Sequence, residues 1–450
     1  MADTASTGGH AVDTPADDRW LYAWATGYAA VGGASLLLPL YALSLGADAF
    51  YVGLMASTAA FAGVPGALLW GRLAGRTGRR RPFILVALVA TALVLLVSPF
   101  ISSPAALVVV NAALWFVVSA AAPVLNLVVV EGVGQSEWDG RIARLNALQG
   151  YGWLVGLVVG TVWTGVAPQL DIGPVIAQRS LLAGLGVLAI VAVLLFARFY
   201  PSAPHTSPER FARGYRRLTR RGWGAGRNLR AIPYGPARIY WGLRSLRSGK
   251  LQDRFSGPLL GYLVAATLFS AGFSVFWGPM PAHLVGLGFT DGVVFLLFLV
   301  GTVGSTVCYE PVAQLTKRFA PARLQLAALG VRAALFVLTA LVVGAALVGG
   351  AFVAIGVTWA VIAITTTGIV TRLADERVRG EALGVVAALA GLGGGVGNAV
   401  GGALASAAGP LVTFALAAAV VLAGGAIGVY SARSAKTTAT GRGENVQVAE

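Results

Sequence analysis

Twelve long apolar stretches, separated by short polar turns, constrain this chain more than any other feature of its sequence. Each is near the roughly 20 residues that an α-helix needs to cross a bilayer at about 1.5 Å per residue. They are unbroken and rich in Ala, Leu, Val and Gly, whereas a membrane β-barrel would show short segments of alternating polarity. We therefore predict an all-α integral membrane protein. The predicted spans cover 20–45, 50–71, 82–101, 104–130, 143–168, 179–199, 257–284, 289–311, 322–345, 347–371, 380–407 and 410–431.

Composition excludes the soluble classes. Charged residues make up 11% of the chain and hydrophobic residues 57%, whereas a soluble domain carries about 25% charged residues. The three histidines, His10, His205 and His283, are scattered, and no P-loop of the form G-x-x-x-x-G-K-[ST] occurs. We therefore expect neither an enzyme nor a self-contained ATP-driven pump, and we expect no metal and no cofactor.

The chain repeats its own plan after about 242 residues, and the repeat appears at three places in the same order. Basic residues Arg76 and Arg318 occupy equivalent turns, and two ladders of glycines four residues apart correspond to one another. The third match pairs Pro39, Tyr41 and Gly46 with Pro281, His283 and Gly288. A duplicated hydrophobic chain of this kind is typical of secondary transporters.

Basic residues fall on alternate sides of the predicted spans, although the net charge of +15 would indicate nucleic acid binding in a soluble protein. The turn at 71–82 is basic, the segment 200–256 holds thirteen Lys and Arg residues, and only Arg179 lies on the opposite side. The positive-inside rule therefore predicts cytoplasmic termini and a cytoplasmic central loop. Aromatic residues within this loop favour binding to anionic headgroups, with a regulatory or partner-binding role as the alternative. We do not expect nucleic acid binding.

These patterns divide the chain into five parts. We expect a disordered cytoplasmic tail at 1–18, a six-helix bundle at 19–199, the basic cytoplasmic loop at 200–256, a second six-helix bundle at 257–431 and a disordered cytoplasmic tail at 432–450. The single cysteine, Cys308, lies within a span, so the chain cannot form an intrachain disulfide.

The turn between the second and third spans carries a family signature of the form G-x-L-a-D-R-x-G-R-R. The matching residues are Gly71, Leu73, Ala74, Arg76, Gly78, Arg79 and Arg80, and Gly75 stands where the signature has Asp. With its six plus six spans and basic central loop, the chain resembles the major facilitator superfamily over about 20–431. The resemblance implies two pseudo-symmetric bundles that rock around a central site, with this turn as a conformational switch. Because Gly75 replaces the acid of the switch, Glu131 and Asp139 become the candidate partners.

The two glycine ladders each lie on one face of a helix, because residues four apart are neighbours on an α-helix. They consist of Gly152, Gly156 and Gly160 in span five and of Gly393, Gly397 and Gly401 in span eleven. We interpret them as the interface where the two bundles move against each other, with static close packing as the alternative. Gly156 is followed by Leu157 and not by the proline associated with exporters of the family.

Few charges lie within the spans, and each is costly enough to need a reason. Arg332 lies about ten residues into span nine. Three roles are open for this residue: it binds an anionic substrate, it pairs with Glu310, or its side chain snorkels to the cytoplasmic surface. Glu131 and Glu310 stand at the cytoplasmic ends of their spans, where they brace basic turns. Span four, 104–130, contains no charged residue, which argues against drug/proton antiport.

Polar and aromatic side chains occur in spans that line the central cavity in the family. The candidates are Tyr28, Asn111, Trp115, Asn126, Gln149, Trp277, Thr365 and Asn398. Such a cavity suits a neutral or amphipathic organic molecule, whereas hydrogen bonds between helices and core packing are the alternative explanation.

The sequence thus predicts a secondary active transporter of small organic solutes that works by rocker-switch alternating access, more readily as an exporter. The alternatives are uptake or facilitated diffusion of a neutral nutrient and, from another class, a membrane sensor or scaffold that moves no solute. We expect a monomer in the cell membrane. Its transport is coupled to a proton, to a sodium ion or to neither.

Overall fold

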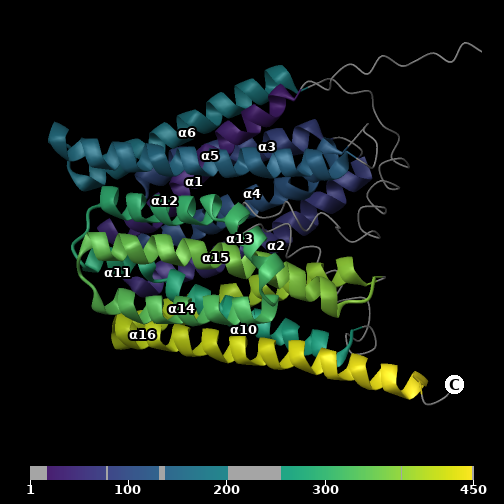
Figure 1. Cartoon of the computed structure of the whole chain (residues 1–450). Coiled ribbons are helices and arrows are strands. Elements are labelled where there is room, and N and C mark those ends of the chain that lie inside the picture. The colour runs from purple at the N-terminus through teal and green to yellow at the C-terminus, as the bar shows by residue number, and fades with distance from the viewer. Residues whose placement is uncertain (1–17, 78–79, 131–136, 201–254, 377, 448–450) are drawn as a thin grey trace, which may run out of the picture.

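The computed structural model of the chain describes residues 18–77, 80–130, 137–200, 255–376 and 378–447. The regular structure in this part of the chain is helical throughout. The helices lie roughly along one direction (Figure 1). Residues 1–17 of the predicted tail at 1–18 and residues 201–254 of the predicted central loop lie outside the described residues.

The first bundle contains six long helices. They are α1 (Arg19–Ser44), α2 (Ala49–Thr77), α3 (Arg81–Val97), α4 (Pro104–Val129), α5 (Trp138–Val166) and α6 (Pro174–Phe199), with short 3₁₀ turns at η1 (Ser98–Phe100) and η2 (Ala167–Leu170). Proline begins α4 and α6, where its fixed φ and missing N–H suit the first helical turn. We call the end of the molecule near Gly46, between α1 and α2, the distal end, and the end near Thr77 the basic end.

The second bundle is built from seven helical segments, two pairs of which are broken spans. They are α10 (Gly257–Trp277), α11 (Met280–Gly286), α12 (Asp291–Val307), α13 (Tyr309–Arg318), α14 (Pro321–Leu341), α15 (Ala345–Leu373) and α16 (Arg379–Gln447). Span seven breaks at Pro279, between α10 and α11, because proline cannot donate to the helical ladder. Cys308 lies between α12 and α13, which are bent by 42°. In Figure 1, α3, α5 and α6 lie on one side of the view and α10, α14 and α16 on the other.

The helices agree with the predicted spans. Among the described residues, ten helices are long and apolar enough to cross a bilayer, and α12 with α13 form an eleventh. α16 contains a break at Gly409, where φ is +81° and Pro410 follows. This break separates the predicted spans at 380–407 and 410–431, so every predicted apolar stretch coincides with helix.

The end of α16 differs from the prediction. The chain stays helical from 432 to Gln447, where we expected a disordered tail. A helix that is already formed extends at little cost, because the unfavourable nucleation step has been taken. The polar composition of this segment did not reveal the continuation.

The internal repeat is a repeat of backbone geometry. Gly46 and Gly288, which follow the first span of each bundle, both have positive φ, at +89° and +83°. In each case the next residue donates a hydrogen bond five residues back: Ala47 N to Ala42 O at 3.0 Å and Phe289 N to Leu284 O at 3.2 Å. Glycine is required at both positions because side chains disfavour this conformation.

Side chains at the repeat-related positions 41 and 283 make matching connections. The Tyr41 hydroxyl donates to Ile101 O at 2.8 Å, just beyond the third span of its bundle. A ring nitrogen of His283 lies 3.1 Å from Thr339 O in the third span of the second bundle. Each first span is therefore hydrogen-bonded to the distal end of its third span, although the two side chains differ.

Candidate functional site

The two bundles meet along two helix pairs at the distal end. α2 crosses α16 where glycines face each other, and a Cβ added to Gly53 would lie 2.5 Å from Cα of Gly402. α5 meets α12 in the same way, and a Cβ on Gly292 would lie 3.2 Å from Gly165 N. The absence of side chains at these crossings lets the backbones of opposite bundles approach closely.

Polar side chains also join the bundles at the distal end. Gln178 of α6 donates to an oxygen of Asp291 at the start of α12, at 2.7 Å, and to the Ser44 hydroxyl at 2.8 Å. The Ser406 hydroxyl of α16 donates to the Asp48 carboxylate. This hydrogen bond is the main reason why the pKa of Asp48 lies below its ordinary value, and backbone N–H groups including that of Tyr51 add to it.

The glycine–glycine crossings and these polar links all lie in the distal halves of their helices, and so do two further contacts. Gly160 of α5 abuts the ring of Phe295 of α12, and a Cβ on Gly395 of α16 would lie 2.8 Å from the ring of Phe61 of α2. In this conformation the bundles are therefore closed against each other at the distal end.

The glycine ladder of span five packs mainly within its own bundle, unlike the predicted interface. A Cβ on Gly152 would overlap the carbonyl oxygen of Ala25 in α1, and one on Gly156 would overlap that of Ala29. Only Gly160 contacts the opposite bundle. The i, i+4 spacing fixes a face of the helix but carries no information about which helix packs on it.

The ladder of span eleven repeats this packing. Cβ atoms on Gly397 and Gly401 would overlap the carbonyl oxygens of Ala271 and Val275 in α10, and one on Gly393 would lie 2.9 Å from Thr267 O. Thr267 and Ala271 follow Ala25 and Ala29 by the same repeat distance of about 242 residues. The two ladders thus form the close contacts of equivalent helix pairs, α5 with α1 in the first bundle and α16 with α10 in the second.

Aromatic residues of the first bundle form a chain across three helices. The rings of Trp24 and Tyr28 in α1 and of Trp153 in α5 and Trp115 in α4 follow one another with centroids 6.2 Å apart at each step. Trp153 lies on the same face of α5 as Asn146, Gln149 and Gly160, at helical spacings. Because Gly160 touches the opposite bundle, this face of α5 is turned toward that bundle.

Two donors near this chain of rings are buried without a hydrogen-bond partner among the described residues. They are Nε1 of Trp24, a residue that is 3% exposed, and Nδ2 of Asn146, a residue that is 8% exposed. Sequence reasoning missed both, although Asn146 stands one turn before Gln149. An unpaired buried donor is costly, by about 1–3 kcal/mol, and a bound molecule with an acceptor oxygen would satisfy it.

The other predicted lining residues divide into three groups. Asn111 and Thr365 are committed to backbone carbonyls: Asn111 Nδ2 donates to Met55 O at 2.9 Å and Thr365 Oγ1 to Val361 O at 2.7 Å. Trp277 lies half-buried in a second ring cluster, 5.4 Å from Phe298 and from Phe352. The remaining members are Asn126 and Asn398, which are half-buried, and Gln149, which is buried.

Arg332 lies inside the second bundle and does not snorkel, contrary to one of the expectations. Its side chain is 1% exposed. It donates to Ile355 O at 2.5 Å and to Thr358 Oγ1 at 3.1 Å, and its guanidinium lies 4.5 Å from the ring centroid of Phe273. Glu310 is exposed on α13. The arginine therefore connects α14 to α15 and α10, where aromatic faces and carbonyls stabilise its charge.

Comparison with known proteins gives the same fold. The family model described as Major Facilitator Superfamily matches residues 23–389, most of the chain. The chain belongs to the major facilitator superfamily. A search of curated proteins finds no match. Among solved structures, the chain is similar to the nucleoside transporter NupG, with a TM-score of 0.69 and 12% identity, covering 92% of this chain and 98% of that one.

A second solved structure has the same fold. It is a bacterial homolog to the human lysosomal transporter Spinster, in an inward-facing and unoccupied conformation, with a TM-score of 0.64 and 12% identity over 92% of this chain and 94% of that one. This chain is accordingly a multi-pass membrane transporter and not an enzyme. Within the described residues, no three His, Cys, Asp or Glu side chains gather as a metal site would require.

The superfamily's signature turn is only partly described. Gly71, Leu73 and Arg76 lie in the last turns of α2, with Leu73 exposed, whereas Gly78 and Arg79 lie outside the described residues. Arg80 is buried beside Tyr200, and burial lowers the pKa of its guanidinium to about 10. Arg81 donates to Ala197 O at the end of α6, at 2.6 Å. This arginine binds a helix C-terminal carbonyl, which connects the turn to its own bundle.

The expected acidic partners of the turn are not visible, because Glu131 and the Asp139 side chain lie outside the described part. Asp18 is an acid that forms ion pairs at the basic end. Its carboxylate lies 3.0 Å from Arg141 and 2.5 Å from Arg144, both in α5. Asp18 falls at the end of the N-terminal tail predicted at 1–18, and the structure describes it immediately before α1.

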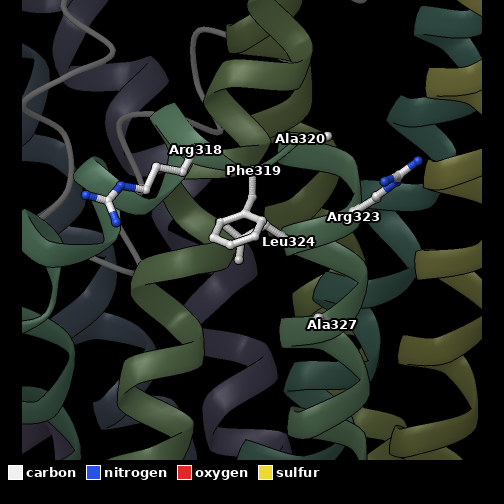
Figure 2. A pocket seen from close by; sticks show the side chains of 6 residues that line it. All are labelled: Arg318, Phe319, Ala320, Arg323, Leu324 and Ala327. Atoms are coloured by element: carbon white, nitrogen blue, oxygen red, sulfur yellow. The ribbon is translucent and has the colours of Figure 1, made fainter.

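A shallow recess of about 300 Å³ lies at the repeat-related turn of the second bundle (Figure 2). Arg318 and Arg323 diverge from each other on either side of Phe319. The other lining residues are Ala320, Leu324 and Ala327. The recess is open at the basic end, away from the contacts between the bundles, so we do not assign it to the transport pathway.

Proposed function

We propose that this transporter moves small neutral or amphipathic organic molecules by alternating access, in the export direction across the cell membrane. The observation that carries the proposal is the closure of the two bundles at the distal end. A protein that closes one end through backbone crossings of glycines and a few hydrogen bonds can separate there at modest cost. The opposite end then closes by rocking of the bundles.

The substrate class follows from the face of α5 that is turned toward the second bundle. Trp153, Gln149 and Asn146 offer ring surface and amide groups but no charge. The buried arginine of the second bundle, Arg332, is already held by Ile355 O and Thr358. A neutral molecule with an apolar body and an acceptor oxygen therefore fits this surface better than a di-anion.

Direction and membrane orientation rest on the sequence. The basic end carries Arg81, Arg141 and Arg318, so we assign it to the cytoplasm by the positive-inside rule. The distal closure then corresponds to a state in which substrate enters from the cytoplasm. Export uses this state for loading, whereas uptake of a neutral nutrient, the second candidate, uses it for release.

The test is transport in liposomes that contain the purified full chain. A panel of neutral and amphipathic compounds is followed with and without a proton or sodium gradient. We expect at least one compound to move, and Trp153→Ala to weaken its binding about tenfold, which corresponds to roughly 1.4 kcal/mol. Val155→Ala is the matched control, since Val155 is exposed on the same helix.

Three results would contradict the proposal. Transport of charged solutes alone would overturn the substrate class, and equal effects of the two substitutions would remove Trp153 from the site. Absence of movement for every compound, in liposomes where the chain is folded, would favour the sensor or scaffold.

A further inference from the structure

Asp291 is the carboxylate through which the two bundles meet at the α6–α12 contact. It begins α12 and is half-buried, and its Oδ2 accepts a hydrogen bond from Nε2 of Gln178 at 2.7 Å. Gln178 belongs to the opposite bundle and is completely buried. Its Nε2 also donates to Ser44 Oγ at 2.8 Å, so both hydrogens of the amide are used.

The amide oxygen of Gln178, unlike the amide nitrogen, has no hydrogen-bond partner among the described residues. This atom, Oε1, is buried. A buried acceptor without a donor is unfavourable, and so is a carboxylate that is partly removed from water. Two unfavourable features therefore lie side by side, an acceptor lacking a proton donor and an acid able to take up a proton.

We propose that Asp291 and Gln178 form a proton-binding site that stabilises the distal closure when a proton is bound. A proton taken from water at the distal face converts the carboxylate to a carboxylic acid. Its O–H donates to Oε1 of Gln178 while Nε2 still donates to the other acid oxygen. An acid and a primary amide can form both hydrogen bonds in one ring, which pairs the amide oxygen and removes the buried charge.

The inference deepens the proposed function, on which it rests, by adding control of the distal closure by the pH at the distal face. The proton site is formed only when the bundles are closed at the distal end, because its two members come from opposite bundles. Binding of a proton therefore favours that state by linkage, and separation of the bundles releases it.

The neighbouring charged and titratable groups have other partners. Arg179 of α6 donates to the Tyr41 hydroxyl at 2.9 Å, His283 of α11 bonds to Thr339 O, and Asp48, just before α2, accepts from Ser406. Asp171, at the end of η2, is exposed. The distal halves of α5 and α15, which also pack against α12, contain no Asp, Glu, Lys, Arg or His.

The experiment follows the distance between the bundles at the distal end as a function of pH. Spin labels are placed at Phe100→Cys and Val343→Cys, which are exposed positions of opposite bundles, in a Cys308→Ser background of the full chain in nanodiscs. Pulsed electron paramagnetic resonance then gives the populations of the closed and open states between pH 5 and pH 8.

In the otherwise unchanged chain we expect the closed-to-open ratio to rise as the pH falls, by at most about tenfold per pH unit, the limit for one proton. Asp291→Asn replaces the protonated acid by an amide that can also donate and accept, so we expect a closed population that no longer depends on pH. Gln178→Leu removes the donor and the acceptor of the amide but leaves Asp291 able to titrate, so we expect the distal end to be more open at low pH than in the parent chain.

Asp48→Asn is the matched control, because Asp48 also accepts a hydrogen bond across the interface but is exposed and retains its charge in this pH range. It should keep the pH dependence. A ratio that does not change with pH, or an Asp291→Asn protein with the same pH dependence as the parent, would overturn the proton site. If Asp291→Asn does not fold, Asp291→Ser, which also removes the titratable group, decides in the same way.

The two proposals fail separately in this design. The distance measurement requires no solute, so a pH-dependent closure without any transport would leave the proton site standing and reject the proposed function. Solute exchange without a gradient, combined with unchanged pH dependence in Asp291→Asn, would support the proposed function and reject the proton site.

Discussion

The two bundles share a backbone plan but differ in what their side chains do at the centre. Both end their first span at a glycine with positive φ, at Gly46 and Gly288, and both press a glycine ladder against that span. The first bundle fills its centre with tryptophan and tyrosine rings, whereas the second buries Arg332 against aromatic faces. Backbone packing has thus been kept where helices must approach closely, and side-chain chemistry has diverged where it does not constrain the fold.

The largest effect should come from the feature that only the second bundle has. Arg332→Ala leaves a cavity and removes the hydrogen bonds to Ile355 O and Thr358 Oγ1 and the contact with the Phe273 ring, so we expect a loss of about 3–5 kcal/mol in unfolding free energy. The measurement is chemical unfolding in micelles. Arg323→Ala, an exposed arginine of the same helix, is the control and should change little. A loss no larger than that of the control would mean that Arg332 does not hold α14 and α15 together.

An intermediate effect, equal in the two bundles, is expected for the glycine ladders. Gly156→Ala and Gly397→Ala each place a methyl group against a backbone carbonyl of the first span of their bundle, which should cost about 1–3 kcal/mol. Gly165→Ala, where the added atom meets open space, is the control. Thermal unfolding of the three variants checks this, and a clear inequality between the two ladder variants would show that the packing is equivalent in position only.

The smallest effect should come from the two turns. Gly46→Ala and Gly288→Ala force a side chain into the left-handed region, for about 1 kcal/mol each, and nothing lies close enough to either position to add a clash. Equal shifts in the unfolding midpoint are expected. A destabilisation at one turn without the other would show that the backbone plan is no longer shared at the distal end.

The fold could be predicted because two independent signals pointed to it, the length of the apolar stretches and their repetition. The site was harder to predict, because the spacing of residues in the sequence identifies a face of a helix but not the helix that packs against that face. The ladder containing Gly156 was therefore assigned to the wrong contact. For Arg332, the burial of its side chain excludes snorkelling among the roles considered, and no pattern indicated its contacts with Phe273 and Thr358, which are distant in the sequence.

Gln178 was missed for a related reason. It lies just before the predicted start of span six at 179, whereas α6 begins at Pro174 and places it inside a helix against the opposite bundle. A neutral polar residue at the edge of an apolar stretch carries no signal by itself. The role of Gln178 depends on its hydrogen bond to Asp291, which is more than a hundred residues away in the sequence and becomes a neighbour only when the two bundles close.

The bend between α12 and α13 has a practical consequence, because its junction is the chain's single cysteine. Cys308 is half-buried, so a thiol-reactive dye can reach it to a degree that depends on the local packing. The unaltered protein therefore carries one built-in attachment point for an optical reporter, located where span eight changes direction. The rate at which that thiol reacts would follow the bend in a working transporter without any substitution in the chain.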